Sequence, residues 1–351
     1  MFFVCKGPTA CFLTDGFYVG LHSVSNPAQD MDLRRPIEKE FAEYQQLLKQ
    51  TIASDVPLLD EVSSHLLQSR GKELRPTLLL LSAAACGGIN SLTLSLAVSL
   101  ELLHTASLIH DDVVDESAQR RFRQSVNAVW GSKVAVLAGD YYLAKVLGIL
   151  PSDTPRIVID SLVDLVKHLS EGELRQLYHS RDFSVTEADY YRIIQCKTAS
   201  MFSFCCYAGA LSAGASATDC EAFRFFGENL GMAFQIRDDI FDYSSDSSIG
   251  KPVGNDLLEG KLTLPLLYAL NSLSTEDSSH WYTLLRQEET ISPDLVRQLY
   301  DLAIAQGGIQ YAEQRIDFYC KEAITAISSV KNSPFKESLL SCLNYVAERQ
   351  I

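Results

Sequence analysis

Six carboxylates, arranged in two copies of one short pattern, are the side chains of this sequence best suited to chemistry. The first copy is Asp111-Asp112-Val113-Val114-Asp115, and the second is Asp238-Asp239-Ile240-Phe241-Asp242. Both copies follow apolar stretches. On a helix, positions four apart stack on one face, so the first and last aspartates of each copy lie side by side. Each copy therefore concentrates negative charge.

Such a carboxylate cluster is costly unless a cation lies in it. Like charges about 4 Å apart repel by roughly 4 kcal/mol at an effective dielectric near 20. Oxygen ligands without His or Cys favour Mg²⁺, which keeps several waters and shares its shell with substrate phosphates. The alternative, that the triplets are only solvated helix faces, fits one copy better than two. The repeated pattern therefore predicts a Mg²⁺ site for a phosphorylated substrate.

Basic side chains flank both acidic motifs, although the chain of 351 residues has a formal net charge of −14. Arginine offers a fork that fits phosphate oxygens, and lysine offers a point charge. Each of these cations alone could be a surface charge, whereas the set predicts a diphosphate pocket. The set comprises Lys72, Arg75, Arg120, Arg121, Lys197, Lys251 and Lys261.

A metal-held diphosphate beside an apolar interior suggests ionisation of an allylic ester. Cations stabilise the departing diphosphate, and a dry cavity protects the carbocation from water. The sequence shows neither a Ser/His/Asp nucleophile set nor a phosphate loop of the GxxxxGK[ST] type. His104, on the apolar face before Asp111, is interpreted either as a core residue or as part of this site.

Composition limits the possible partners and surroundings. Hydrophobic residues make up 47% of the chain, which is enough for a large core. The acidic balance, without any basic block, argues against nucleic acid as a partner. Nine cysteines without a CxxC pair indicate a reducing, cytoplasmic setting. The longest apolar run, Leu92 to Ile109, contains Glu101 and His104, so no membrane-spanning segment is expected.

Helical periodicity dominates from residue 31 onward, and no alternating strand pattern of useful length is present. We therefore expect one all-α domain over 31–351, with nine or more helices. Residues 1–30 contain several helix breakers, and we hypothesise that Met31 is the true start. The expected helices cover 37–67 with a break at Pro57, then 77–86, 91–115, 126–150, 154–179, 185–211, 217–243 and 262–273, with more from 293 to the end.

Residues 71–265 resemble the trans-isoprenyl diphosphate synthase family, the polyprenyl synthetases. The signatures of that family are DDxxD followed by RR, here Asp111 to Asp115 with Arg120-Arg121, and a later FQxxDDxxD, here Phe234 to Asp242. The resemblance implies an all-α bundle around a deep central apolar cavity, a homodimer, and three Mg²⁺ per active site. It implies head-to-tail condensation of isopentenyl diphosphate with an allylic diphosphate.

The resemblance also assigns roles to matching residues. It implies that Asp111, Asp112, Lys197, Thr198 and Asp238 are catalytic. The Mg²⁺ ligands it implies are Asp111, Asp112, Asp115, Asp238, Asp239 and Asp242. The allylic diphosphate would be held by Arg120, Lys197, Gln235, Lys251 and Lys261. Isopentenyl diphosphate would be held by Lys72, Arg75, His104 and Arg121.

Two positions depart from the family pattern. Glu73 follows Lys72 where such enzymes carry Arg, which would weaken the local positive field. Phe122 follows Arg121 where Gly is usual, which affects the expected loop conformation.

Side chains about one turn before the first acidic motif are expected to line the path of the growing hydrocarbon tail. Ala106 and Ser107, at the fifth and fourth positions before Asp111, are both small. A bulky aromatic there would act as a floor, so we expect a long-chain product with a deeper floor near Leu103 or Leu147.

Three alternatives remain open at this point. The first is a short-chain synthase making farnesyl or geranylgeranyl diphosphate. The second is a terpene cyclase, although cyclases of this fold carry an Asn/Ser/Glu metal set in place of a second DDxxD. The third is a non-catalytic subunit of a heteromeric synthase, which the presence of all six aspartates disfavours.

Overall fold

The computed structural model describes residues 33–68, 71–120, 123–180, 183–243, 254–287 and 291–348. Within these ranges the only strands are β1 (Gln119–Arg120) and β2 (Arg123–Gln124), which pair in an antiparallel ribbon. All other regular elements there are helical, which confirms the expected all-α class.

The helices before the second aspartate motif form a continuous series. Their order is η1 (Arg35–Ile37), α2 (Glu38–Ile52), α3 (Pro57–Leu67), α4 (Leu74–Cys86), α5 (Ser91–Val114), α6 (Val126–Trp130), α7 (Ser132–Gly148), α8 (Arg156–Ser180), α9 (Glu187–Ile194), η2 (Gln195–Ala199), α10 (Ser200–Ser212) and α11 (Ala217–Phe241). The remainder are α12 (Asn255–Leu258), α13 (Leu264–Ser272), α14 (Thr275–Gln287), α15 (Pro293–Ala305), α16 (Gly308–Ala326) and α17 (Pro334–Glu348).

Several boundaries differ from the sequence expectation, and α14 lies between two stretches for which helices were expected. Helix α4 begins at Leu74, so Arg75 and Pro76 lie in its first turn and not in the preceding loop. Proline is well tolerated there because the first turn has no intrahelical partner for its missing N–H. The stretch expected as one helix over 126–150 divides at Gly131, which has a φ of 83°. Glycine adopts that left-handed conformation without a Cβ penalty.

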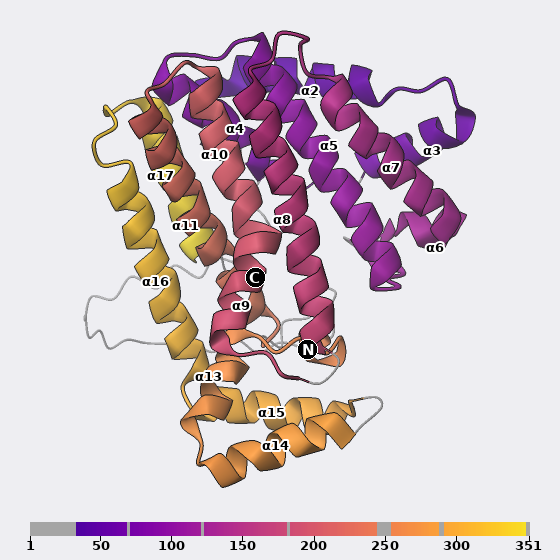
Figure 1. The fold of residues 1–351 in the computed structure, drawn as a ribbon, viewed down its shortest axis with the longest axis vertical. Coiled ribbons are helices and arrows are strands. Elements are labelled where there is room, and N and C mark those ends of the chain that lie inside the picture. Colours follow the sequence, from indigo (N-terminus) through magenta and orange to yellow (C-terminus); the bar gives the residue numbers. More distant parts are fainter. Residues whose placement is uncertain are drawn as a thin grey trace, which may run out of the picture.

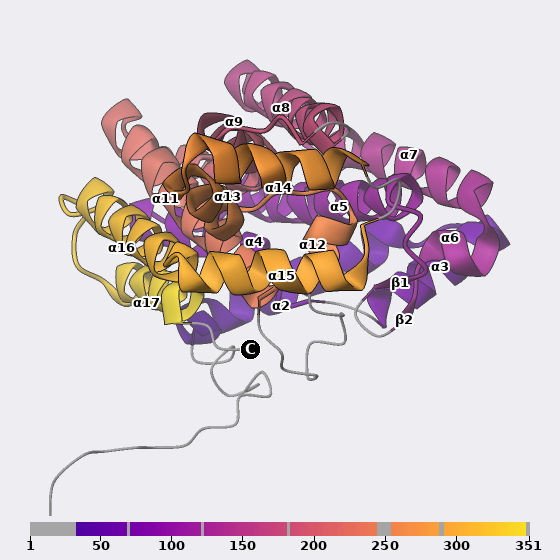
Figure 2. The same ribbon diagram turned by 90° about the horizontal axis from the view of Figure 1, so that it is seen from below.

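The long helices run lengthwise side by side, and α14 and α15 lie across one end of the bundle (Figure 1). Seen from that end, α12 appears between α14 and α15 (Figure 2). The aspartate motifs occupy the C-terminal ends of α5 and α11. Two segments that are distant in sequence thus occupy equivalent positions, each at the C-terminal end of a long helix of the bundle.

Helix α5 is a core helix that carries the first motif at its end. A capping box starts it, since the Asn90 side chain accepts from the Thr93 backbone and the Thr93 hydroxyl accepts from the Asn90 backbone. By length and composition α5 could span a membrane. However, 61% of its most apolar stretch is buried inside the bundle. Its apolar character is therefore explained by packing against its neighbours.

Helix α10 packs against α11 and also contacts α4 and α5. Phe202, Phe223 and Phe226 are fully buried, and Cys205 and Cys206 are buried with them. This packing fixes α11, and with it the second aspartate motif, relative to α5.

Candidate active site

The first aspartate motif divides its carboxylates between two environments. Asp112 is buried and accepts a hydrogen bond of 2.8 Å from Arg120 Nε, while Asp111 and Asp115 are half-buried. Burial raises the pKa of Asp112, and the Arg120 guanidinium partly offsets that rise. Arg120 thus neutralises the Asp112 carboxylate. Asp111 and Asp115 interact instead with lysines from other parts of the chain.

Asp111 lies in the field of Lys197. Burial raises the pKa of Asp111 to about 6, Lys197 lowers it in part, and Glu173 on α8 raises it. The Lys197 ammonium is in turn 2.5 Å from Glu173 Oε2 and 3.5 Å from Gln176 Oε1. A carboxylate whose charged form is penalised in this way would be stabilised by a bound cation.

Lys197 and Thr198 lie in a π-helical turn, η2, between α9 and α10. Such turns are uncommon and often occur at functional sites, because the extra residue redirects neighbouring side chains. Gly172 of α8 permits close packing here, since a Cβ on it would lie 2.8 Å from the Lys197 backbone nitrogen. Sequence periodicity missed this turn, and no signal in the sequence distinguishes it from continuous α-helix.

A chain of hydrogen bonds connects η2 to the second motif. Thr198 Oγ1 donates to Gln235 Oε1 at 2.7 Å, and Gln235 Nε2 donates to Asp239 Oδ1 at 2.9 Å. The Tyr190 hydroxyl donates to the other oxygen of Asp239 at 2.6 Å. Burial raises the pKa of Asp239 to about 8, Asp256 adds to the rise, and the bonds from Tyr190 and Gln235 oppose it. Tyr190 was not among the residues expected from the sequence.

Asp242 has a structural task that the sequence did not reveal. Its carboxylate accepts hydrogen bonds from the backbone N–H groups of Asn255 at 3.1 Å and Asp256 at 3.2 Å, and from the Tyr300 hydroxyl. It therefore anchors α12 beside the second motif. Its role as a metal ligand stays a prediction, as does that of half-buried Asp238.

Lys261 connects the second half of the site to the first motif. Its ammonium lies 3.9 Å from Asp115 Oδ2 and also pairs with Glu259. Burial alone would lower the pKa of Lys261, but Glu259 and Asp115 together raise it above its usual value. The lysine thus remains charged between the carboxylates.

One cavity of about 140 Å³ lies where these groups meet. Its polar wall includes Lys197, Thr198, Gln235, Asp239 and Lys261. The structure therefore brings together predicted residues from three separate regions of the chain. This is the arrangement expected of a pocket that holds a diphosphate beside carboxylates.

The donor set fits Mg²⁺ only with help from the substrate. Among the described residues, no group of three or more His, Cys, Asp or Glu side chains comes close enough to hold a metal ion. The available donors are carboxylate oxygens, which match Mg²⁺, and this ion usually completes its shell with water and substrate phosphates. The carboxylates of two helices fit such shared binding.

Three of the four residues expected to hold isopentenyl diphosphate, Lys72, Arg75 and His104, lie at or beside α4. Arg75 Nη1 is 3.1 Å from His104 Nε2, and the Arg75 guanidinium lies 5.1 Å from the centre of the Phe202 ring. Lys72 donates to the hydroxyl of Tyr345 on α17, with its ammonium 4.7 Å from the ring centre. Arg75 and His104 therefore come together, and α17 contributes a neighbour that the sequence did not suggest.

Glu73, the first departure from the family pattern, is directed toward α2. Its carboxylate accepts from Tyr44 OH at 3.2 Å and from Gln45 Nε2 at 2.9 Å. The residue has a φ of 45°, a left-handed conformation at the N-terminus of α4. These hydrogen bonds engage both of its oxygens. The expected weakening of the positive field by Glu73 stays a prediction.

Several sequence-based predictions fall on residues outside the described ranges. These are Arg121 and Phe122 after the first motif, Lys251 after the second, and the proposed extension over 1–30. They stay predictions.

The small residues before the first motif lie inside the bundle. Ala106 is fully buried, and Ser107 is half-buried with its hydroxyl bonded to the His104 carbonyl at 2.9 Å. Leu103 is buried one turn earlier, as a deep floor requires. Leu147 is 53% exposed on α7, so the expectation that it forms this floor is wrong for the single chain.

The comparison with protein families agrees with this geometry. A family model described as polyprenyl synthetase matches residues 56–303. The chain belongs to the polyprenyl synthetase family. It is therefore a trans-prenyltransferase with the isoprenoid synthase fold, and the resemblance noted in its motifs is confirmed.

Other members of this family are similar over nearly their whole length. The all-trans-nonaprenyl-diphosphate synthase (geranyl-diphosphate specific) of Rhodobacter capsulatus is 34% identical over 320 residues, covering 91% of this chain and 97% of the relative. A crystal structure of polyprenyl synthase from Caulobacter crescentus, complexed with calcium and isoprenyl diphosphate, superposes with a TM-score of 0.85 at 32% identity, covering 92% and 98% of the two chains. The geranylgeranyl pyrophosphate synthase of Bacteroides thetaiotaomicron gives a TM-score of 0.79 at 38% identity, covering 92% and 100%.

Proposed function

We propose that this polyprenyl synthetase condenses isopentenyl diphosphate with an allylic diphosphate and repeats the step to make a long-chain polyprenyl diphosphate. The observation that carries this proposal is the meeting of Lys197, Gln235, Asp239 and Lys261 around one cavity. Two of its lysines also reach the first motif, since Lys261 lies 3.9 Å from Asp115 and Lys197 acts on Asp111. The Caulobacter relative, crystallised with calcium and isoprenyl diphosphate, supports a divalent cation and a diphosphate as ligands of this fold.

The side chains divide the work of the condensation. Lys197, Gln235 and Lys261 hold the allylic diphosphate, joined by Arg120 and Lys251. Asp111, Asp115 and Asp238, with Asp112, Asp239 and Asp242, would hold Mg²⁺, three ions by family resemblance. When bound, these ions supply positive charge that stabilises the departing diphosphate. Arg75 and His104, with Lys72 and Arg121, orient isopentenyl diphosphate.

The bonds change in a balanced sequence. The carbon–oxygen bond of the allylic ester breaks, and its electron pair leaves with the diphosphate. The double bond of isopentenyl diphosphate then supplies the electrons of the new carbon–carbon bond, and a proton passes to the released diphosphate. Buried apolar side chains such as Leu103 and Ala106 keep water away from the cation.

The small side chains before the first motif favour a long product. Ala106 and Ser107 leave no aromatic floor directly beneath Asp111. The Rhodobacter relative is a nonaprenyl-diphosphate synthase, which supports the same conclusion. The similarity to a geranylgeranyl pyrophosphate synthase keeps a short-chain product as the second candidate.

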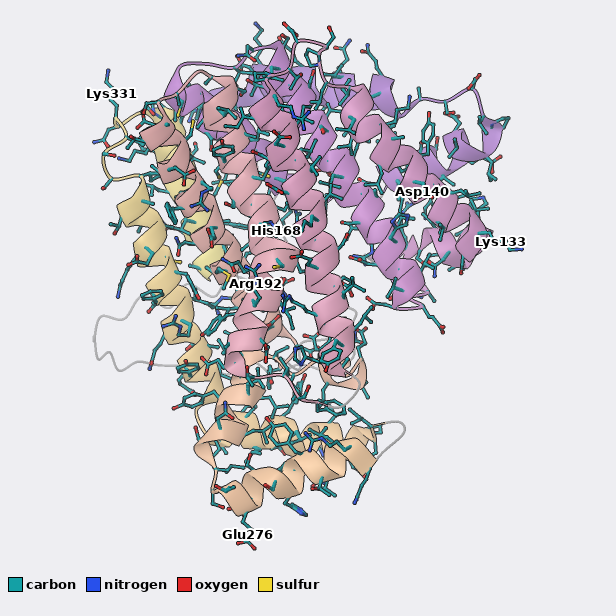
Figure 3. All side chains as sticks on the ribbon, viewed as in Figure 1. Lys133, Asp140, His168, Arg192, Glu276 and Lys331 are labelled. Carbon is teal, nitrogen blue, oxygen red and sulfur yellow. The ribbon has the colours of Figure 1, made fainter. Side chains whose placement is uncertain are left out.

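We also propose a homodimer that works in the cytoplasm. Large apolar side chains are exposed on α7 and α8, including Leu137 at 68%. Leu137 lies one helical turn from both Lys133 and Asp140, whose side chains project from the outer side of the bundle (Figure 3). Such apolar surface favours association.

All seven described cysteines are free, which suits a reducing compartment.

The decisive experiment incubates purified protein with isopentenyl diphosphate, Mg²⁺ and one allylic primer at a time, and sizes the products by chromatography. We expect products longer than geranylgeranyl diphosphate. Products that stop at that length would support the short-chain candidate, and no elongation with any primer would support a non-catalytic subunit.

The proposed homodimer is tested by Leu137→Glu, which is expected to convert a dimer to a monomer in light scattering.

A further inference from the structure

Asp239 is held from both sides by neutral donors. It is 5% exposed, and each of its carboxylate oxygens accepts one hydrogen bond, from Tyr190 OH at 2.6 Å and from Gln235 Nε2 at 2.9 Å. A carboxylate bonded at both oxygens cannot rotate without breaking a hydrogen bond. Its position therefore depends on a tyrosine that lies on another helix.

Tyr190 is itself fixed by its surroundings. It is 4% exposed on α9, a short helix that a capping box between Thr186 and Asp189 begins. The same helix continues directly into η2, which carries Lys197 and Thr198. The hydroxyl of Tyr190 thus bridges from the segment that supplies Lys197 to the helix that supplies the second motif.

The bridge completes a closed set of contacts. Thr198 donates a hydrogen bond to Gln235, Gln235 donates to Asp239, and Tyr190 also donates to Asp239. The backbone from Tyr190 along α9 to Thr198 closes the ring. Loss of one member would leave a buried oxygen without its donor and allow the others to turn. In metal sites, residues that orient the ligands typically matter 10–100-fold for metal affinity or activity.

We propose that Tyr190 is a positioning residue for the second aspartate motif, which holds Asp239 and thereby sets Gln235 and the neighbouring aspartates toward the diphosphate and its Mg²⁺. This inference rests on the proposed function for the identity of the ligands. It predicts that the tyrosine hydroxyl affects Mg²⁺-dependent diphosphate binding more than the binding of isopentenyl diphosphate.

The test compares Tyr190→Phe with the wild type in thermal unfolding, with inorganic diphosphate present and Mg²⁺ titrated. This measurement requires no turnover. We expect the Mg²⁺ concentration for half-maximal stabilisation to rise about 10–100-fold. In steady-state assays the KM for the allylic diphosphate should rise, while the KM for isopentenyl diphosphate stays within about twofold of wild type. An unchanged Mg²⁺ requirement would overturn the proposal, whatever the loss of thermal stability.

Tyr191→Phe is the matched control. Tyr191 is the adjacent residue on α9, and its hydroxyl accepts from Arg315 Nε on α16 at 3.1 Å, whereas that of Tyr190 donates to Asp239. We expect its Mg²⁺ requirement to match the wild type. An equal rise in both variants would assign the effect to packing of α9 and would overturn a specific role for Tyr190.

A double variant keeps the proposal testable if Tyr190→Phe alone does not fold. Tyr190→Phe with Asp239→Asn leaves no buried charge without its donor. If Tyr190 acts through Asp239, the double variant should match Asp239→Asn alone in its Mg²⁺ requirement. A further tenfold rise in the double variant would show that Tyr190 acts elsewhere.

The wild type separates this inference from the proposed function. Mg²⁺-dependent stabilisation by diphosphate without elongation of any primer would overturn the function and leave the role of Tyr190 intact. Absence of that stabilisation would overturn the role of Tyr190 in binding, even if elongation occurs.

Discussion

The ammonium of Lys261 lies 3.9 Å from a carboxylate oxygen of Asp115. Lys261 follows α12, whose first backbone N–H groups bind Asp242 of the second motif. A contact at the first motif is therefore positioned by a residue of the second. The two halves of the site are connected by protein contacts before any ligand binds.

Lys261→Met should weaken binding of the allylic diphosphate. Hydrogen bonds to charged groups contribute about 1.5–3 kcal/mol, which corresponds to at least about a tenfold rise in KM for the allylic substrate. The KM is measured with isopentenyl diphosphate at saturation. Lys331→Ala, at the end of the molecule opposite Glu276 in Figure 3, is the control and should leave the KM unchanged. Equal effects in both variants would contradict the assignment.

Gly172→Ala should disturb the π-helical turn. The added methyl would lie 2.8 Å from the backbone nitrogen of Lys197, so α8 or η2 must move. We expect a loss of about 1–3 kcal/mol in the free energy of unfolding, measured with urea, together with a lower kcat. A matched substitution, Gly148→Ala, meets no atom within 4 Å at the end of α7 and should be neutral or slightly stabilising. Wild-type kcat in Gly172→Ala would argue against η2 as a positioning element.

Asp111 should make the protein less stable as the pH rises when no Mg²⁺ is present. Burial raises its pKa from 3.8 to about 6 in the folded state, so the native form binds more protons than the unfolded form between these values. Its stabilising contribution is complete below about pH 4 and is lost as the pH passes 6. One pKa unit corresponds to about 1.4 kcal/mol, so the loss is at most about 3 kcal/mol.

This loss is measured as the free energy of unfolding in urea, for wild type and Asp111→Asn, from pH 4 to 7 in the presence of a metal chelator. The amide does not titrate, so the free energy of unfolding of the wild type should fall relative to the variant over that interval. Parallel curves would show that Asp111 has an ordinary pKa.

Ala106→Phe should shorten the product. Ala106 is fully buried one turn before the first motif, so an aromatic ring there would fill the path of the tail. Product size is read by chromatography under the conditions of the elongation assay. Leu147→Ala, at an exposed position, is expected to leave product length unchanged. An unaltered product from Ala106→Phe would mean that the tail takes another route.

Much of the molecule followed from the sequence alone. The apolar period of 3.6 residues predicted the helical class, because residues three and four positions apart lie on the same face of a helix and can be buried together. The repeated aspartates and their flanking cations likewise indicated diphosphate chemistry, since residue type and spacing determine which ligands can be held.

Only the tertiary structure decided how those residues share the work. The hydrogen bonds from Tyr190 to Asp239 and from Tyr300 to Asp242 join residues far apart along the chain, as does the ion pair of Lys261 with Asp115. Packing of the helices selects such pairs, and no local pattern encodes them. The π-helical turn at Lys197 likewise depends on the neighbouring α8, where Gly172 allows the close approach. Periodicity is a property of neighbours in sequence, whereas the environment of a buried carboxylate is set by whatever the fold places against it.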